Sequence, residues 1–220
     1  MESAKTSLSS QLKKILGDDL IQVTTSLGET TAHVMASSLV RTLTILRDNE
    51  STQFQQLIDI GGVDYPERPQ RFDVVYHLLS VHLNHRLRVK VRTDGLTKIP
   101  SVIRVYPCAN WLERETWDLF GIEFSDHPDI RRLMTDYEFE GHPLRKDFPL
   151  TGYVEPRYDE GTKSVQYGPV NLPQDYRSFD YLSPWEGVAA HMRKLDEMND
   201  PDGNGNSDAN DNAKQRKGAA

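Results

Sequence analysis

The chain has 220 residues, a formal net charge of −7 at pH 7 and one cysteine, Cys108. The acidic balance argues against a nucleic-acid-binding protein, whose contact surface is basic. One cysteine can form neither an internal disulfide nor the four-thiolate cage of an iron–sulfur cluster. No apolar run approaches the roughly 20 residues that cross a bilayer, so we expect any membrane association to come through partners.

Periodicity over the first 120 residues predicts an α+β domain, with a small mixed or antiparallel sheet and helices on one face. Helices are expected where leucine recurs at helical spacing, over residues 8–16 and 38–49. Strands are expected over residues 21–25, 31–35, 56–63, 72–79 and 87–92, and the alternation of apolar and polar residues is clear over 87–92. Turns at residues 26–29 and 81–85 make two hairpins.

A third amphipathic helix is predicted over residues 111–120. Asn110 and Glu113 have the spacing of a capping box at its start. Gly121 suits its C-terminus, because glycine adopts the left-handed conformation at little cost. The wheel places Leu112, Trp117, Leu119 and Phe120 on one face. The opposite, polar face holds Arg114, Glu115 and Asp118.

Glu113 projects from the apolar face of this helix, where a carboxylate needs a partner. The alternatives are the backbone at Asn110 and the side chains of Arg131 or Arg132. Two shorter helices are also expected. One covers residues 101–105, and a one-turn helix covers residues 128–133, where Pro128 fits a first helical position.

Residues 121–195 lack a sustained period and are interpreted as a signature segment followed by an extended arm. Within the arm, residues 163–170 indicate a strand and residues 184–192 a last turn of order. The arm carries aromatic side chains separated by prolines, among them Tyr153, Tyr158 and Trp185. Such side chains cannot readily form a core of their own, so we expect them to dock on a partner. Residues 196–220 are polar and of low complexity, which predicts a disordered tail.

Two groups of side chains could be drawn as metal sites. One group combines acids with a histidine: Glu113, Glu115, Asp118, His127 and Asp129. Glu113 and Glu115 face different ways on a helix, and the chain has no H-E-x-x-H or paired-cysteine motif, so structural ion pairs are favoured. The other group is His77, His82 and His85 around a hairpin turn, where surface histidines are the commoner interpretation. Cys108 is interpreted as a structural thiol, because no His or Lys nearby in the sequence would lower its pKa.

The stretch from the third helix onward resembles one protein family. It begins at Glu113-Arg114-Glu115, passes through Gly141-His142-Pro143 and reaches Arg157-Tyr158-Asp159, with a looser match to Trp185. This string is similar to the family of the thirty-kilodalton or C subunit of respiratory complex I, the bacterial NADH–quinone oxidoreductase. Pro156 stands where the family has an aliphatic residue.

The resemblance implies a non-catalytic structural subunit in the peripheral arm of the proton-translocating enzyme. It would lie beside the quinone-site subunit, which resembles a hydrogenase large subunit, and near the iron–sulfur subunits. It implies no redox centre on this chain: FMN and the clusters belong to partners, and the whole complex uses NADH and quinone. The cytoplasmic face of the bacterial inner membrane is the expected location, with the matrix face of the mitochondrial inner membrane as the alternative.

Three other functions stay open at this point. They are a subunit of a related membrane-bound hydrogenase-type complex, a metal-dependent hydrolase using the acidic and histidine cluster, and an adaptor that binds a peptide at a sheet edge. For the favoured function, no catalytic, cofactor-binding or metal-binding residue is expected. The residues expected to shape the signature segment or to contact partners are Glu113, Arg114, Glu115, His127, Arg131, Arg132, Asp136, Gly141, His142, Pro143, Arg145, Lys146, Asp147, Tyr153, Arg157, Tyr158 and Trp185.

Overall fold

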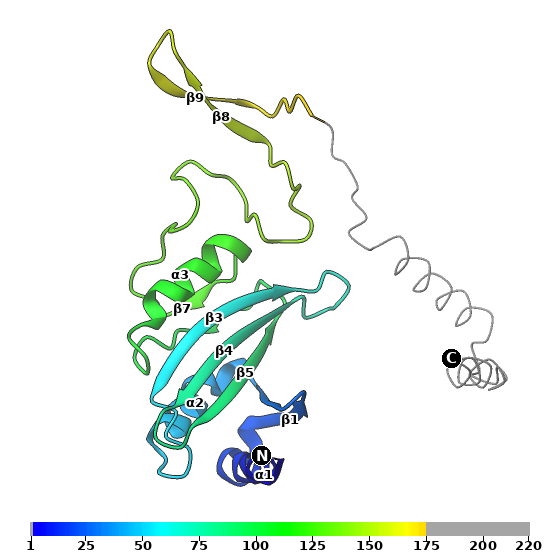
Figure 1. The fold of residues 1–220 in the computed structure, drawn as a ribbon, viewed down its shortest axis with the longest axis vertical. Coiled ribbons are helices and arrows are strands. Elements are labelled where there is room, and N and C mark those ends of the chain that lie inside the picture. The colour runs from blue at the N-terminus through cyan, green and yellow to red at the C-terminus, as the bar shows by residue number, and fades with distance from the viewer. Residues whose placement is uncertain (1, 175–220) are drawn as a thin grey trace, which may run out of the picture. The chain divides into compact units, whose positions relative to one another are not determined.

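The structure is a computed structural model that describes residues 2–174, with side chains from residue 8 onward. A five-stranded mixed sheet with strand order β1-β2-β5-β4-β3 forms its centre (Figure 1). The strands are β1 Leu20–Ser26, β2 Glu29–Val34, β3 Gln56–Asp64, β4 Phe72–Ser80 and β5 His85–Thr93. β2 and β5 pair in parallel, and the other neighbours are antiparallel. All five strands expected from the sequence are therefore confirmed.

The first hairpin turns at Leu27 and Gly28, whose φ angles of 48° and 80° are both positive. Positive φ at both central residues is the signature of a turn that matches the right-handed twist of paired strands. This turn sets the register of β1 against β2, in which Ser26 pairs with Glu29. The turn expected at residues 26–29 is confirmed.

Three helices cover one face of the sheet: α1 Glu2–Leu16, α2 Leu39–Asp48 and α3 Ala109–Phe120 (Figure 1). Short 3₁₀ turns, Gly17–Asp19 and Ala36–Ser38, precede β1 and α2. One cluster joins the inward side chains of the helices to those of the strands, including Leu12, Leu43, Tyr76, Val89 and Phe120. The predicted α+β class with helices on one face is confirmed.

α3 lies closely against β3 because Gly62 has no side chain. A Cβ at this position would lie 2.6 Å from a ring carbon of Phe120. Phe120 is the last residue of α3, and Gly121 follows it in the left-handed conformation, with φ 71°. The predicted glycine terminus of this helix is confirmed.

The two shorter helices predicted from sequence are wrong. Residues 101–105 form a turn after β6 Ile99–Pro100, which pairs in parallel with β7 Phe124–Ser125. The N–H of Ser101 donates to the carbonyl of Ser125 at 2.9 Å, so this backbone extends the β6–β7 pairing instead of entering a helix. Residues 128–133 are likewise non-helical.

Beyond residue 150 the chain forms a further hairpin, β8 Val154–Asp159 and β9 Ser164–Pro169. The predicted strand over residues 163–170 is confirmed as β9. Its partner β8 was missed, because Pro156 weakens the strand signal. The turn expected over residues 184–192, Trp185 and the polar tail lie outside the described residues. None of the helices described here is long and apolar enough to span a bilayer.

Candidate functional site

Asp118 organises the loop that follows α3. Its side chain is fully buried. One carboxylate oxygen accepts backbone N–H groups from Leu133, Met134 and Thr135 at 2.9, 2.7 and 2.9 Å. The other accepts the Thr135 hydroxyl at 2.5 Å and the Arg132 guanidinium at 2.8 Å. Burial alone would raise the pKa of Asp118, but these donors hold it well below its usual range.

Residues 142–145 cap the C-terminal end of α3. Nδ1 of His142 donates to the carbonyl of Asp118 at 2.9 Å, and the N–H of Leu144 donates to the carbonyl of Leu119 at 3.0 Å. Arg145 donates through Nε to the carbonyl of Phe120 at 2.5 Å. The last carbonyls of a helix have no partner within the helix, so this stretch satisfies groups that would otherwise need water.

A second buried carboxylate, Asp64 at the end of β3, holds the other end of the loop. Arg71 makes a two-pronged ion pair with it, with both N–O distances at 2.7 Å. The backbone N–H of Lys146 also donates to Asp64 at 2.7 Å. Arg71 extends to Asp147 at 2.8 Å on the surface. The hydrogen bond from Arg71 is the main reason that the pKa of Asp64 is lowered.

Glu113 is the third buried carboxylate. It accepts the Ser101 hydroxyl and the N–H of Val102, both at 2.7 Å. Nε2 of His127 lies 3.9 Å from the same carboxylate, and both side chains are fully buried. Burial raises the pKa of Glu113 to about 7, against the opposing effect of the two hydrogen bonds.

Two predictions about this helix are corrected. No side chain caps its start, and Asn110 lies inside it, so the capping box is wrong. Glu113 pairs with the turn before α3 rather than with Arg131, Arg132 or the backbone at Asn110. The polar face of the helix is covered by the loop that follows it, because Arg114 donates to the carbonyls of Arg131 and Arg132.

We call residues 126–150 the anchored segment, because buried groups on α3 and β3 fix a stretch without helix or strand. The predicted site residues divide by exposure. Counted as whole residues, backbone included, Glu113 and Arg114 are buried, and the half-buried ones are Glu115, His127, Arg132, His142, Pro143 and Arg145. Those exposed are Arg131, Asp136, Gly141, Lys146, Asp147, Tyr153, Arg157 and Tyr158. Sequence reasoning missed Asp64 and Arg71 entirely, since 76 residues separate Arg71 from its partner Asp147.

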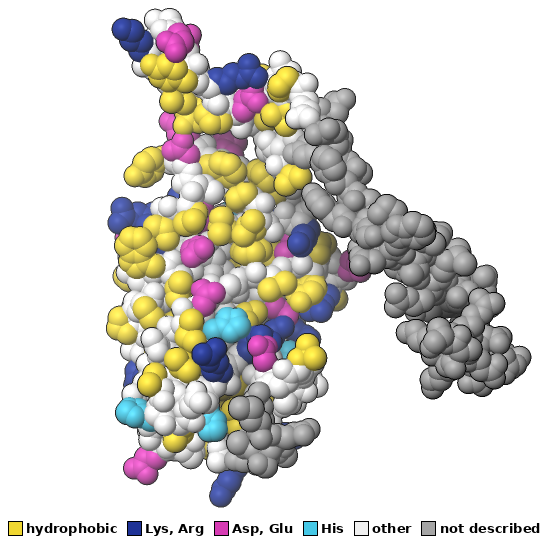
Figure 2. All heavy atoms as spheres, in the orientation of Figure 1, with side chains coloured by type: hydrophobic (Ala, Val, Ile, Leu, Met, Phe, Trp, Pro, Cys, Tyr) yellow, Lys and Arg dark blue, Asp and Glu magenta, His cyan; other side chains and the backbone are white. Residues whose placement is uncertain are grey.

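The anchored segment and the strands after it carry large exposed apolar side chains. They include Met134, Tyr137, Leu144, Leu150 and Tyr153. Hydrophobic side chains show on the part of the surface where Figure 1 places the loop after α3 and the β8–β9 hairpin (Figure 2). The ring of Phe148 contacts the rings of Phe139 and Tyr153, with centroids 5.8 and 5.6 Å apart. A surface of this kind is suited to contact another protein.

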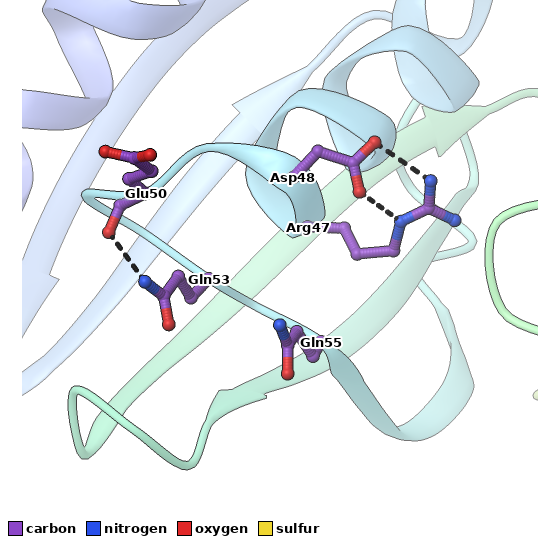
Figure 3. Close-up of a pocket in the computed structure, with 5 residues that line it drawn as sticks. All are labelled: Arg47, Asp48, Glu50, Gln53 and Gln55. Carbon is purple, nitrogen blue, oxygen red and sulfur yellow. Dashed lines mark hydrogen bonds and ion pairs between the residues drawn. The ribbon is translucent and has the colours of Figure 1, made fainter.

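Other parts of the described chain offer less chemistry. Across residues 8–174, no three His, Cys, Asp or Glu side chains converge as a metal site would require. A surface pocket at the end of α2 is lined by Arg47, Asp48, Glu50, Gln53 and Gln55 (Figure 3). Two of its charged groups already pair with each other: Arg47 bonds Asp48 at 2.6 Å and also donates to the carbonyl of Val105.

Comparison with known proteins gives consistent matches. The family model described as "Respiratory-chain NADH dehydrogenase, 30 Kd subunit" matches residues 32–154, which include the anchored segment. The NADH-quinone oxidoreductase C subunit of Methylobacterium radiotolerans is 56% identical over 187 residues, covering 85% of this chain and 87% of the relative. That of Paramagnetospirillum magneticum is 62% identical over 160 residues, covering 73% and 80%. A chain of the membrane-bound sulfane sulfur reductase, an archaeal respiratory membrane complex, is similar in structure, with a TM-score of 0.57 and 25% identity, covering 67% of this chain and 86% of that chain.

Proposed function

Because this chain belongs to the 30-kDa subunit family of the respiratory-chain NADH dehydrogenase, we propose that it is a non-catalytic structural subunit of the enzyme's peripheral arm. In this proposal it docks beside the quinone-site subunit and helps to hold that subunit and its iron–sulfur neighbours in place. The complex carries electrons from NADH to quinone, and this chain contributes rigidity to the frame in which they move.

The observation that carries the proposal is the anchored segment itself. An irregular loop that exposes Tyr137 and Leu150 to 95% and 86% would ordinarily be mobile. Here its backbone is bonded to the side chains of Asp64 and Asp118, which are inaccessible to water. A surface ordered before binding loses less conformational entropy when a partner docks, which strengthens the complex.

The possible ligand residues of the chain support placing the redox cofactors on partner subunits. One cysteine cannot hold an iron–sulfur cluster, which takes four protein ligands, usually thiolates. The carboxylates that could have served as metal ligands are used differently: Asp118 accepts five hydrogen bonds from the anchored segment. FMN and the clusters therefore belong to neighbouring subunits in this proposal, and NADH and quinone bind elsewhere in the complex.

The same proposal gives the location. The two relatives compared above belong to bacterial enzymes, so we infer the cytoplasmic face of the bacterial inner membrane, with attachment through partner subunits. The alternative, the matrix face of the mitochondrial inner membrane, predicts the same partners. Fractionation of membranes after washing with high salt and then with detergent tests attachment through partners. Release of the chain alone by salt would contradict it.

A matched pair of substitutions tests the docking surface. Leu150 in the anchored segment and Leu96 in the loop after β5 are 86% and 88% exposed. We expect Leu150→Asp to reduce the partner subunits recovered with a tagged chain in mild detergent, and to lower the NADH:quinone reductase activity of the membranes. Leu96→Asp introduces the same charge at equal exposure and should do neither. Equal behaviour of the two variants would contradict the assigned surface.

Truncation tests the extended arm. Among the described residues, the buried core cluster ends at Phe124 and the last hydrophobic residue packed against it is Ile130, so we expect removal of residues 156–220 to spare it. We expect the shortened chain to keep its circular dichroism spectrum and to lose stable incorporation into the enzyme. Removal of only residues 199–220 serves as the control. An unfolded truncated chain, or full incorporation without the arm, would contradict the proposal.

A second candidate has one observation in its favour. The similar chain in the sulfane sulfur reductase belongs to a respiratory membrane complex other than an NADH–quinone oxidoreductase. Identities of 56% and 62% to the two bacterial relatives, against 25% to that chain, favour the first candidate. Identification of the proteins that co-purify with the chain decides between them, because only the first candidate requires an NADH-oxidising subunit in the complex.

A further inference from the structure

The β8–β9 hairpin has one wholly apolar face. Strand residues alternate between faces, and the register pairs Val154 with Pro169, Pro156 with Tyr167 and Tyr158 with Val165. These six side chains therefore share a face, and all six are exposed; Val154 and Val165, for example, are 58% and 55% exposed. The other face carries the remaining residues of both strands: Glu155, Arg157, Asp159, Ser164, Gln166 and Gly168.

Two described contacts tie the hairpin to the anchored segment, both in its half nearer to Val154 and Pro169. The Tyr153 ring packs on Phe148 with centroids 5.6 Å apart, and the hydroxyl of Tyr167 bonds Asp136. The two strands form a sheet by themselves, with no third strand among the described residues. A two-stranded hairpin is at best marginally stable in water, and an apolar face needs a surface to cover it.

The two edges of the hairpin differ in their free hydrogen-bonding groups. The N–H of Val170 donates to the carbonyl of Tyr153, so this opposite pair directs its backbone groups inward, toward the partner strand. In an antiparallel pair, successive residues direct their N–H and C=O groups alternately toward the partner strand and outward, away from it. The next inward pair is Glu155 and Gly168. The residues between the inward ones on β8, which are Val154, Pro156 and Tyr158, therefore direct their backbone groups outward. On β9 the outward groups belong to Val165, Tyr167 and Pro169.

The prolines leave the β9 edge better suited to pair with another strand than the β8 edge. Proline has no N–H, so Pro156 removes a donor from the middle of the β8 edge. Pro169 removes one only at the end of the β9 edge, where Val165 and Tyr167 still present an uninterrupted pair of N–H and C=O groups. An open strand edge of this kind is a template for another strand.

We propose that an extended segment of a partner subunit adds to β9 as a third strand, hydrogen-bonded to Val165 and Tyr167. Its alternate side chains are apolar and continue the apolar face of the hairpin. The proposal rests on the function proposed above, because the partner is another subunit of the same complex. β9 lies beyond the residues that the family model matches. The mode of binding is strand addition, in which backbone hydrogen bonds give affinity and alternate side chains give specificity.

Amide hydrogen exchange on the full-length chain, free and within the purified complex, tests the edge. Free, the outward amides of Val154, Tyr158, Val165 and Tyr167 exchange quickly. In the complex we expect those of Val165 and Tyr167 to slow by at least about tenfold, and those of Val154 and Tyr158 to stay fast. Protection of all four amides, or of none, overturns the proposal. So does protection of the β9 amides in the free chain, which would assign the edge to residues 171–220 or to a second copy.

Two matched substitutions separate backbone pairing from surface contact. Val165→Pro and Val154→Pro make the same chemical change on the same face and remove an outward N–H from β9 and β8 respectively. We expect only Val165→Pro to lower, by about tenfold or more, the fraction of chain recovered in the complex. Circular dichroism of both variants controls for folding. Equal losses would mean that the face is covered without strand addition. Failure of the unsubstituted chain to enter any complex would instead overturn the proposed function.

Discussion

The helix-covered face of the sheet and the anchored segment are both ordered, but by different forces. The first is held by apolar side chains such as Leu12, Leu43 and Val89, all of them inaccessible to water. The second has little core of its own, and its backbone is bonded to Asp64 and Asp118. Apolar packing is non-directional and tolerates exchange of similar side chains, whereas a buried carboxylate requires each of its donors in place.

This contrast separates stability from function along one chain. Substitutions in the core should lower the free energy of unfolding and leave the shape of the docking surface intact. Substitutions at the carboxylates should change the shape of the anchored segment as well. Four experiments test this division.

The largest effect is expected for Asp118→Ala. The substitution leaves three backbone N–H groups, a hydroxyl and the Arg132 guanidinium without their acceptor. We expect the free energy of unfolding to fall by about 3–5 kcal/mol, as when one partner of a buried ion pair is removed. Urea titration measures it. Asp129→Ala is the control, because it removes an exposed ion pair with Arg131. It should change the free energy of unfolding by less than about 1 kcal/mol. An unchanged midpoint for Asp118→Ala would show that the anchored segment does not need it.

Leu43→Ala probes the other region. Leu43 is fully buried between α2 and the sheet, so the substitution leaves a cavity. We expect a loss of about 2–5 kcal/mol, with unchanged hydrogen exchange at the amides of Leu133 to Thr135 under native conditions. Leu96→Ala, at an exposed site, controls for the change of residue type. Faster exchange in the anchored segment of Leu43→Ala would show that the two regions are not independent.

The buried carboxyl of Glu113 should make the free energy of unfolding depend on pH. Its pKa in the folded chain is about 7, above the ordinary 4.5, so the folded state holds the proton more tightly than the unfolded state. The stability that protonated Glu113 contributes is therefore complete below pH 4.5 and is lost as the pH rises toward 7. Glu113→Gln removes this dependence. We expect the stability of the parent relative to the variant to fall by roughly 1–3 kcal/mol between pH 4.5 and pH 7.

Parallel urea titrations of parent and variant across this range measure the difference, and effects of other titrating groups cancel. A constant difference would mean that Glu113 stays ionised in the folded chain. A difference that grows with pH in favour of the parent would reverse the sign and show a close cationic partner.

The smallest effect is expected for Asp147→Asn. Asp147 pairs with Arg71 but is largely exposed, while Asp64 on the same guanidinium is buried. Exposed ion pairs contribute little, so we expect a loss below about 1 kcal/mol, which added salt should reduce further. Asp64→Asn is the buried comparison and should cost several times more in the same titration. Equal losses would show that exposure does not distinguish the two pairs.

The regular elements were predictable because their side chains repeat. β5 follows a two-residue alternation and α2 a helical period, and each begins and ends within three residues of its expected limits. Turn chemistry was also local: Gly28 and Gly121 take positive φ angles, as glycine does at little cost. The family, too, could be identified from the chain alone, because Glu113-Arg114-Glu115 and Gly141-His142-Pro143 occur in order.

The anchoring contacts were not predictable. A helical wheel shows which side chains of α3 share a face but not that a loop will cover the opposite face, where Asp118 and Arg114 are buried. The same limit produced the false capping box at Asn110 and the false helix over residues 128–133. In each case a backbone group bonds a side chain distant in the sequence: the carbonyl of Asn110 bonds His127, and the N–H of Leu133 bonds Asp118.

The sheet, its three helices and the family could all be inferred from the order of residues, because burial on one face imprints a period on neighbouring positions. Three features emerged only from the folded chain: which carboxylates are buried, that Arg71 joins Asp64 to Asp147, and that β8 pairs with β9 despite Pro156. These features depend on hydrogen bonds between segments without a period. Such bonds form only where folding has already brought donor and acceptor together.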